Sequence, residues 1–351
     1  MINSLMFSAA NGDYMKKILL LANSEPFSSP SGFKEQSELR LKALTYLRST
    51  GLTDSEAWAE VNAKYPHTPP SMSDEQRTQR TRDLNELIID AGPSIITDLE
   101  KIVLSGGENV QWSRMALAQI GNDKSVDVIQ LGYKPGSGGI RSMDDFQHET
   151  AICLARAARR NSDDVKFLLN FCSRPSGFNV YSEAALNLVA IRAKDAIPAF
   201  KSALKNDPMD IFYKDSLERI TSDLAVVSVE ELNNNGREVI AAIFSNGVPF
   251  FLNAQEVRDE KNNGIWRRNK NTWTFVSNAT VETFYSIDFD VHISPDNKRA
   301  FADVTQKTMG NSKTNAHEFN YYYVLENTDS SWRIRWLQMK RRADLYFLPV
   351  Q

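Results

Sequence analysis

Cysteine is scarce in this sequence, with only two among 351 residues, Cys153 and Cys172. Two cysteines cannot form the disulfide framework of a small secreted scaffold, and they lack the paired spacing of a structural zinc site. Both stand in apolar helical patterns, which favour buried side chains with free thiols. We therefore expect a reducing, cytoplasmic environment.

Long apolar runs are also missing. The stretch at 18–22 follows two lysines in the manner of a secretory signal, but such a signal has an apolar core of about 7–15 residues. No run approaches the roughly 20 residues with which a helix crosses a bilayer. We expect neither a cleaved leader nor a membrane partner.

An excess of one charge is missing too. The 41 basic and 44 acidic residues leave a formal net charge of −3, so no general basic field attracts nucleic acid. The composition, with 42% hydrophobic residues, is that of a folded protein. The length suits two or three domains.

The sequence pattern divides the chain into four regions. We predict an irregular lead at 1–33, a helical hairpin with a Pro-rich linker at 34–73, helical repeats at 74–225 and an antiparallel α+β domain at 226–351. The hairpin also has the outline of a helix-turn-helix, a DNA-binding motif. Its second helix opens with Asp54-Ser55-Glu56, whose carboxylates repel phosphate, so a hairpin that covers the next domain is favoured.

The region 74–225 repeats one pattern of a helix, a short polar break and a second apolar helix. The anchor residues of the second helices are spaced 30, 39 and 32 residues apart: Ile96, Val126, Val165 and Ile197. Alanines crowd the first helices, and small side chains allow neighbouring helix pairs to stack closely. Because the spacing varies, an irregular helical bundle is the alternative.

This pattern resembles HEAT-type repeats, particularly the short variety of bacterial proteins. Its spacing is shorter than the common HEAT period of about 40–47 residues. The resemblance implies an α-solenoid in which each helix pair buries its apolar face against its neighbours. It also implies an extended concave surface for a protein partner and no catalytic centre within the repeats.

The period changes to two in the C-terminal region. Apolar and polar side chains alternate along 286–293 and 299–304, with turn residues between them at 294–297, which predicts a hairpin. A second, aromatic-rich hairpin follows at 319–336, and four such strands must pack on helices or on another sheet. The predicted fold class is multidomain, α then α+β, with a HEAT-like solenoid before a mainly antiparallel sheet.

The register of the first hairpin follows from its turn. A four-residue loop at 294–297 places Val291 opposite Ala300 and Asp288 opposite Asp303. The same register places Arg299 opposite His292. All the apolar residues then share one face of the sheet, and a slip of one residue would destroy that arrangement.

The last predicted strand, 331–336, has the sequence Ser-Trp-Arg-Ile-Arg-Trp. The meander that ends in it resembles the closing strands of the cone-shaped α+β family that includes nuclear transport factor and scytalone dehydratase. That resemblance implies a pocket between sheet and helix, in which members of the family hold a small ligand or a partner.

Three residues of the alternating strand are the candidate catalytic residues. Asp288, Asp290 and His292 project from one strand face, because side chains alternate with period two. Two carboxylates and an imidazole can share a proton or ligate a metal. The same alternation is typical of a solvated sheet face, which is the favoured interpretation, and we predict no metal and no cofactor.

Two groups of cations are the candidate partner-binding residues. One lies at the end of a repeat helix and one on a predicted hairpin beside a tryptophan: Arg156, Arg159 and Arg160, and Trp266, Arg267 and Arg268. Cations interleaved with aromatic rings can also bind single-stranded nucleic acid. The charge balance of the region disfavours that partner.

These observations favour a non-enzymatic scaffold or adaptor that binds a protein partner along its helical repeats. Two alternatives stay open. One is a C-terminal domain that binds a small ligand or acts as a hydrolase or dehydratase through the candidate carboxylates and imidazole. The other is a nucleic-acid-associated protein that uses the hairpin at 34–65 and Arg267-Arg268.

Overall fold

The computed structural model describes residues 14–15, 74–106, 109–121, 123–133, 143–174, 177–178, 183–208, 211–221, 225–232, 236–246, 254–280, 285–308 and 317–340. The hairpin predicted at 34–73 and, apart from 14–15, the lead predicted at 1–33 lie outside these residues.

Helices fill the first part of the described chain. In order they are α5 (Asp74–Ala91), the 3-10 turn η2 (Gly92–Ile95), α6 (Ile96–Ser105), α7 (Val110–Ile120), α8 (Ser125–Gln130), α9 (Met143–Arg159), α10 (Ser162–Cys172), α11 (Glu183–Ala190), the 3-10 turn η3 (Lys194–Ala196), α12 (Ile197–Asn206) and α13 (Ile211–Thr221). A short hairpin of β1 (Ser173–Arg174) and β2 (Gly177–Phe178) follows α10.

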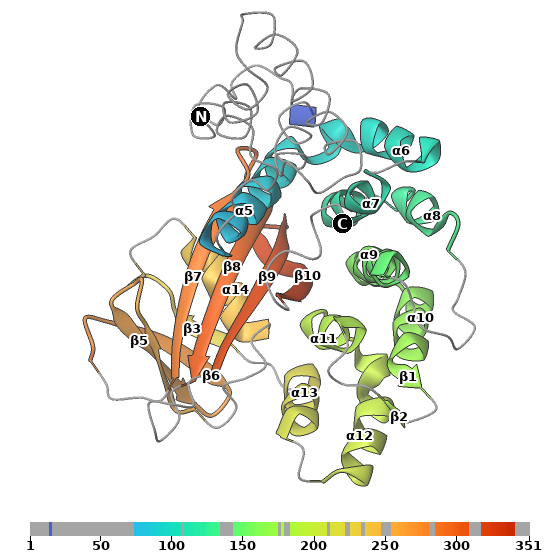
Figure 1. The fold of residues 1–351 in the computed structure, drawn as a ribbon. Coiled ribbons are helices and arrows are strands. Elements are labelled where there is room, and N and C mark those ends of the chain that lie inside the picture. Colours follow the sequence, from blue (N-terminus) through green and yellow to red (C-terminus); the bar gives the residue numbers. More distant parts are fainter. Residues whose placement is uncertain are drawn as a thin grey trace, which may run out of the picture.

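The helices after α5 form two rows beside the sheet. Helices α7, α9 and α11 lie on the inner side and α8, α10 and α12 on the outer side (Figure 1). Helix α11 shows why the inner row is buried, since its seven residues from Ala184 to Ala190 all lack solvent exposure. A helix that is apolar on all sides is stable only when other elements surround it.

The three inner helices end in the same way. Each is followed by a residue with left-handed backbone: Gly121, Arg160 and Arg192, with φ of 59°, 56° and 52°. Such a residue stops a helix and turns the chain. Each stands five residues before an anchor predicted from the sequence: Val126, Val165 and Ile197. The three turns therefore share their distance from the next anchor and a positive φ.

The second part of the chain forms an eight-stranded sheet in the order β10-β9-β8-β7-β4-β5-β6-β3. Its strands are β3 (Ala225–Ser228), β4 (Glu256–Asp259), β5 (Gly264–Asn269), β6 (Thr272–Ser277), β7 (Tyr285–Ile293), β8 (Arg299–Thr308), β9 (His317–Thr328) and β10 (Ser331–Lys340), with α14 (Arg237–Asn246) between β3 and β4. All neighbours pair antiparallel except β3 with β6 and β4 with β7. Helices followed by a mainly antiparallel sheet are thus confirmed.

The predicted register of the β7–β8 hairpin is wrong by two residues. Val291 lies opposite Ala302 instead of Ala300, and Asp303 lies opposite Asp290 instead of Asp288. The physical reason is at the turn, where the Ser294 amide donates to the Arg299 carbonyl at 2.9 Å, so the loop is 295–298. Likewise His292 faces Phe301 instead of Arg299. An even shift keeps every side chain on its predicted face.

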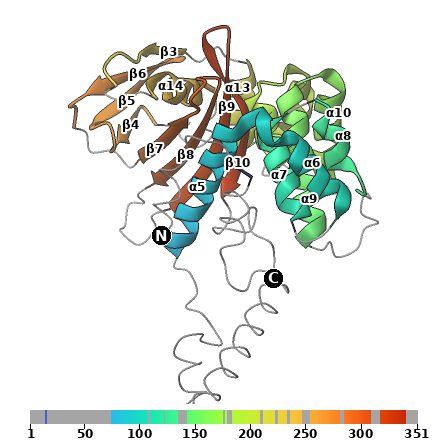
Figure 2. The same cartoon turned by 90° about the horizontal axis from the view of Figure 1, so that it is seen from above.

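Both faces of the sheet are buried against helices. On one face, Phe244 of α14 stacks on Trp266 with 4.3 Å between ring centroids and fills the space above the strands. On the other, Phe301, Tyr322 and Trp336 pack in a core shared with α5, α6, α7, α8 and α9. Helix α5 lies over the strands and also contacts α7 of the inner row, while α9 and α11 contact β10 (Figure 2).

Candidate functional site

A cluster of seven ionisable side chains joins α5 to the sheet. Positions 82, 86 and 90 are one helical turn apart and project from one side of α5, and positions 290 and 292 share one face of β7. We call this cluster the α5 clamp: Arg82, Glu86, Asp90, Lys261, Asp290, His292 and Asp303.

Arg82 connects α5 to two strands. Its guanidinium lies 2.7 Å from the Asp290 carboxylate and 3.1 Å from the buried Asp303 carboxylate. Lys261, in the turn after β4, lies 2.9 Å from the other oxygen of Asp290. Burial raises the pKa of Asp290, but the hydrogen bond from Lys261 and the charge of Arg82 outweigh burial, so its pKa lies below the ordinary value. Asp290 is therefore a carboxylate at neutral pH.

His292 occupies the other end of the clamp, between two carboxylates of α5. Its Nε2 lies 2.8 Å from Asp90 Oδ1, and its Nδ1 lies 3.8 Å from Glu86 Oε2. The hydrogen bond to Asp90 raises the pKa of His292 above its ordinary value, despite the opposing effect of burial. Burial raises the pKa of Glu86.

The structure thus gives the predicted catalytic residues separate partners. Asp290 and His292 do share a face, but each contacts α5, and Asp288 on the same face is exposed. Within the described ranges, no group of three or more His, Cys, Asp or Glu side chains is arranged to hold a metal ion. The contacts of Asp290 and His292 are those of an interface between helix and sheet.

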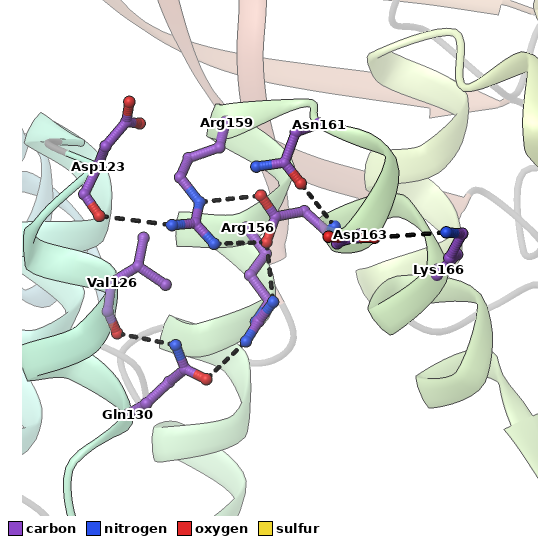
Figure 3. A network of polar contacts seen from close by, with 9 residues as sticks. Asp123, Val126, Gln130, Arg156, Arg159, Asn161, Asp163 and Lys166 are labelled. Atoms are coloured by element: carbon purple, nitrogen blue, oxygen red, sulfur yellow. Dashed lines mark hydrogen bonds and ion pairs between the residues drawn. The ribbon is translucent and has the colours of Figure 1, made fainter.

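The predicted basic patch of α9 is engaged within the helical region. Arg156 and Arg159 both contact the fully buried Asp164 carboxylate, at 2.8 and 2.7 Å (Figure 3). Arg156 also donates to Gln130 Oε1 at 2.6 Å, and its guanidinium lies 4.1 Å from the centroid of the Phe167 ring. These contacts join α8, α9 and α10, so the two guanidinium groups serve packing between helices.

Arg160 takes part in a different set of contacts, which joins the ends of helices to the C-terminal part of the chain. We call it the arginine seam, and its four members each donate to a backbone carbonyl: Arg160 to Ile334, Arg192 to Ser245, Arg299 to Ile89 and Arg335 to Gly121. Through the seam, α5, α7, α9 and the turn after α11 contact β8, β10 or α14. A Cβ on Gly121 would collide with the Arg335 guanidinium, and the positive φ there also favours glycine.

Asn187 of α11 completes the attachment of the inner row to the sheet. Its side-chain amide donates to the Leu337 carbonyl at 2.8 Å and accepts from the Leu337 amide at 3.0 Å. Since β10 is at the edge of the sheet, Asn187 satisfies backbone groups that a further strand would otherwise pair. An exposed edge invites association with other chains, and this contact covers part of it.

Trp266, one of the candidate partner-binding residues, is a core residue of the sheet. Its side chain is fully buried, stacks on Phe244 and donates from Nε1 to Asp259 Oδ2 at 3.0 Å. The residue belongs to the core because its strand position faces α14. The neighbouring Arg267 is paired with Glu256 at 2.8 Å and Arg268 with Glu218, so an acidic side chain faces each of these two cations.

The sequence analysis missed the half of the clamp that α5 contributes. Arg82, Glu86 and Asp90 do recur every four residues, but most other positions of this helix are also polar or charged, so the spacing does not single them out. It also missed the arginine seam, since a guanidinium that binds a distant carbonyl leaves no local pattern.

Comparison with known proteins adds no further identification. The chain matches no family model, no curated protein and no solved structure. In the described part of the chain, no helix combines the length and the apolar character needed to cross a membrane.

Proposed function

We propose that this chain is a non-enzymatic adaptor whose helix pairs form a HEAT-like stack and bind a protein partner on the outer row. The likeness of the three turns at Gly121, Arg160 and Arg192 supports a stack of related units. Their distances along the chain, 39 and 32 residues, equal the distances between the anchors that follow them. Structures of this kind present long surfaces to partners.

The attachment of the inner row to the sheet directs the proposal to the outer surface. The arginine seam and Asn187 hold α7, α9 and α11 against β10 and its neighbours. The concave side that such a stack usually offers is therefore occupied by the chain's own sheet. A partner can contact the outer row without displacing the sheet.

The observation that carries the proposal is a pair of exposed leucines, one on α6 and one just after α8. Among the described residues, Leu104 of α6 and Leu131 just after α8 are the large hydrophobic side chains with high exposure, 63% and 48%. The two helices touch, since Ser125 Oγ donates to Glu100 Oε1 at 3.1 Å. Leu104 lies one turn beyond Glu100, and Leu131 lies just beyond the other end of the helix that begins at Ser125. A contiguous apolar patch marks an interaction site, and the proposal is that these two leucines belong to one such surface.

The enzyme alternative receives less support from the geometry. Asp290 and His292 are engaged with α5, and Phe244 fills the space between α14 and the strands where the cone-shaped family holds a ligand. The nucleic-acid alternative also receives less support, because Arg267 and Arg268 form ion pairs with Glu256 and Glu218. These contacts favour the adaptor over both.

The test is site-specific photo-crosslinking on the full chain. A photoreactive amino acid at position 131 is expected to give one heterologous product in extract of the producing cells, whereas the same group at the exposed Lys201 of α12 gives none. The purified partner should then bind the unmodified chain at least about tenfold more tightly than Leu104→Glu, a loss of 1.4 kcal/mol or more. Lys201→Glu is the matched control.

Three outcomes would contradict the proposal. They are equal products from positions 131 and 201, products that contain only a second copy of the chain, and a partner whose affinity is the same for the Leu104→Glu variant. Circular dichroism of each variant confirms that the comparison is made between folded proteins.

A further inference from the structure

The α5 clamp contains a group that can change charge near neutral pH. We propose that His292 makes the clamp a proton-operated contact, in which α5 is held firmly on the sheet when the imidazole is protonated and less firmly when it is neutral. This inference concerns the contact between α5 and the sheet and does not depend on the partner surface at Leu104 and Leu131.

The geometry of the imidazole gives the first argument. Glu86 and Asp90 are one turn apart on α5, and they face the two nitrogens of one ring. A neutral imidazole has a single N–H and can donate to one carboxylate, whereas the imidazolium has two and carries the charge that attracts both. The protonated ring therefore attracts both carboxylates of α5, through a hydrogen bond to Asp90 and through its charge to Glu86 at 3.8 Å.

The charges around the ring give the second argument. From α5 the acidic groups are Glu86 and Asp90, from β7 Asp290 and from β8 Asp303, while the fixed cations that contact them are Arg82 and Lys261. Four carboxylates thus face two permanent cations. A proton on His292 supplies a third cation where the excess of negative charge is greatest, at the end of α5 that Arg82 does not reach.

Other charged groups near the clamp have partners of their own. Asp83 of α5 accepts a hydrogen bond from Gln79 at 2.7 Å. Arg299 of β8 lies 3.4 Å from Asp296 and donates to the Ile89 carbonyl. Asp288 of β7 is exposed to solvent. These groups leave His292 as the member of the clamp that titrates closest to neutral pH.

The direction of the pH effect follows from the folded state. Because the hydrogen bond to Asp90 raises the pKa of His292, its contribution is complete below the unfolded-state value of about 6.5 and is lost as pH rises through the folded-state value. Burial also raises the pKa of Glu86. Ionisation of Glu86 as pH rises therefore also weakens the contact between α5 and the sheet. The clamp is therefore tightest in mildly acidic solution and loosens above neutrality.

Hydrogen exchange of the full chain tests the proposal. After correction for the intrinsic rate, amides of α5 are expected to lose about three- to tenfold in protection between pH 6 and pH 8.5, while amides of α11 keep theirs. In His292→Gln, which keeps a neutral donor of similar size, α5 should show the lower protection at both pH values. His317→Gln, at the start of β9, controls for the loss of a different histidine.

Two results would overturn the proposal. One is a constant corrected protection of α5 across the pH range, and the other is an unchanged pH dependence in His292→Gln. If His292→Gln fails to fold, the NMR titration of the His292 Cε1–H in the unmodified chain decides. A midpoint at or below about 6.5 would contradict the protonated contact with Asp90.

Discussion

Two ion-pair networks in this chain use the same chemistry in different surroundings. Around Asp164, two arginines meet a carboxylate that has no solvent exposure and joins three neighbouring helices. In the α5 clamp, Arg82 meets Asp290 and Asp303 at a helix–sheet interface that water reaches in part. Burial makes the first network necessary for stability, because water cannot solvate a charge there that has lost its partner. Partial exposure leaves the second network adjustable.

The largest effect is expected from removal of the buried carboxylate. Asp164→Ala leaves Arg156 and Arg159 facing each other without their common partner, so the free energy of unfolding should fall by about 3–5 kcal/mol. Chemical denaturation measures this loss. The control is Asp163→Ala, one residue away, whose side chain is 87% exposed and whose removal should cost less than about 0.5 kcal/mol. Equal losses would show that burial is not what separates the two networks.

A second effect concerns the edge of the sheet. Asn187→Leu keeps the volume of the side chain but removes the donor and the acceptor that pair with Leu337, which is fully buried. Two buried backbone groups without partners should cost about 2–4 kcal/mol in unfolding experiments. Asn206→Leu, at the exposed end of α12, is the matched change and should leave stability within about 0.5 kcal/mol. A small loss in Asn187→Leu would mean that water replaces the amide at the edge.

The arginine seam can be tested at one glycine. Gly121→Ala places a methyl group against the Arg335 guanidinium in a left-handed conformation, so Arg335 must give up its bond to the Gly121 carbonyl. A loss of about 1–3 kcal/mol is expected. Gly132→Ala has positive φ as well, 75°, but open space around the added carbon, and should cost only about 1 kcal/mol. The difference in the free energy of unfolding between the two variants measures the Arg335 contact separately from the backbone strain.

For both the α5 clamp and the arginine seam, sequence reasoning identified residues on one side of the contact and missed their partners. The reason is the same in both cases. Strand alternation placed Asp290 and His292 on one face correctly, since period two survives an even error in register. The partner of His292 is Asp90, 202 residues earlier in the chain, and no local pattern relates positions so far apart. The repeating pattern predicted short breaks between the helices, whereas the carbonyl acceptors of Arg160 and Arg192 depend on how the helices meet the sheet. Trp266 stayed among the partner-binding candidates because a strand pattern does not tell which face a helix will cover.

A smaller effect is expected from the half-exposed network at acidic pH. The pKa of Asp290 lies below its ordinary value of about 3.9, so its contribution is present above that value and is lost as pH falls through the folded-state pKa. Asp290→Asn should lower stability at pH 7 by about 1 kcal/mol or less, since the side chain is 40% exposed. It should also flatten the loss of stability below pH 4. Denaturation at pH 3 and pH 7 measures both effects. If the loss of stability below pH 4 is the same in Asp290→Asn, that loss comes from other carboxylates.

The smallest effect is expected where an ion pair lies at the surface. Arg267 and Glu256 approach to 2.8 Å, a separation similar to that of Arg156 and Asp164, but 57% of the Arg267 side chain is exposed. Arg267→Ala should therefore change the free energy of unfolding by about 0–0.5 kcal/mol, and 1 M salt should remove even that difference. Denaturation of both proteins in low and high salt checks this. A loss comparable to that of Asp164→Ala would show that distance, and not burial, sets the strength of ion pairs in this chain.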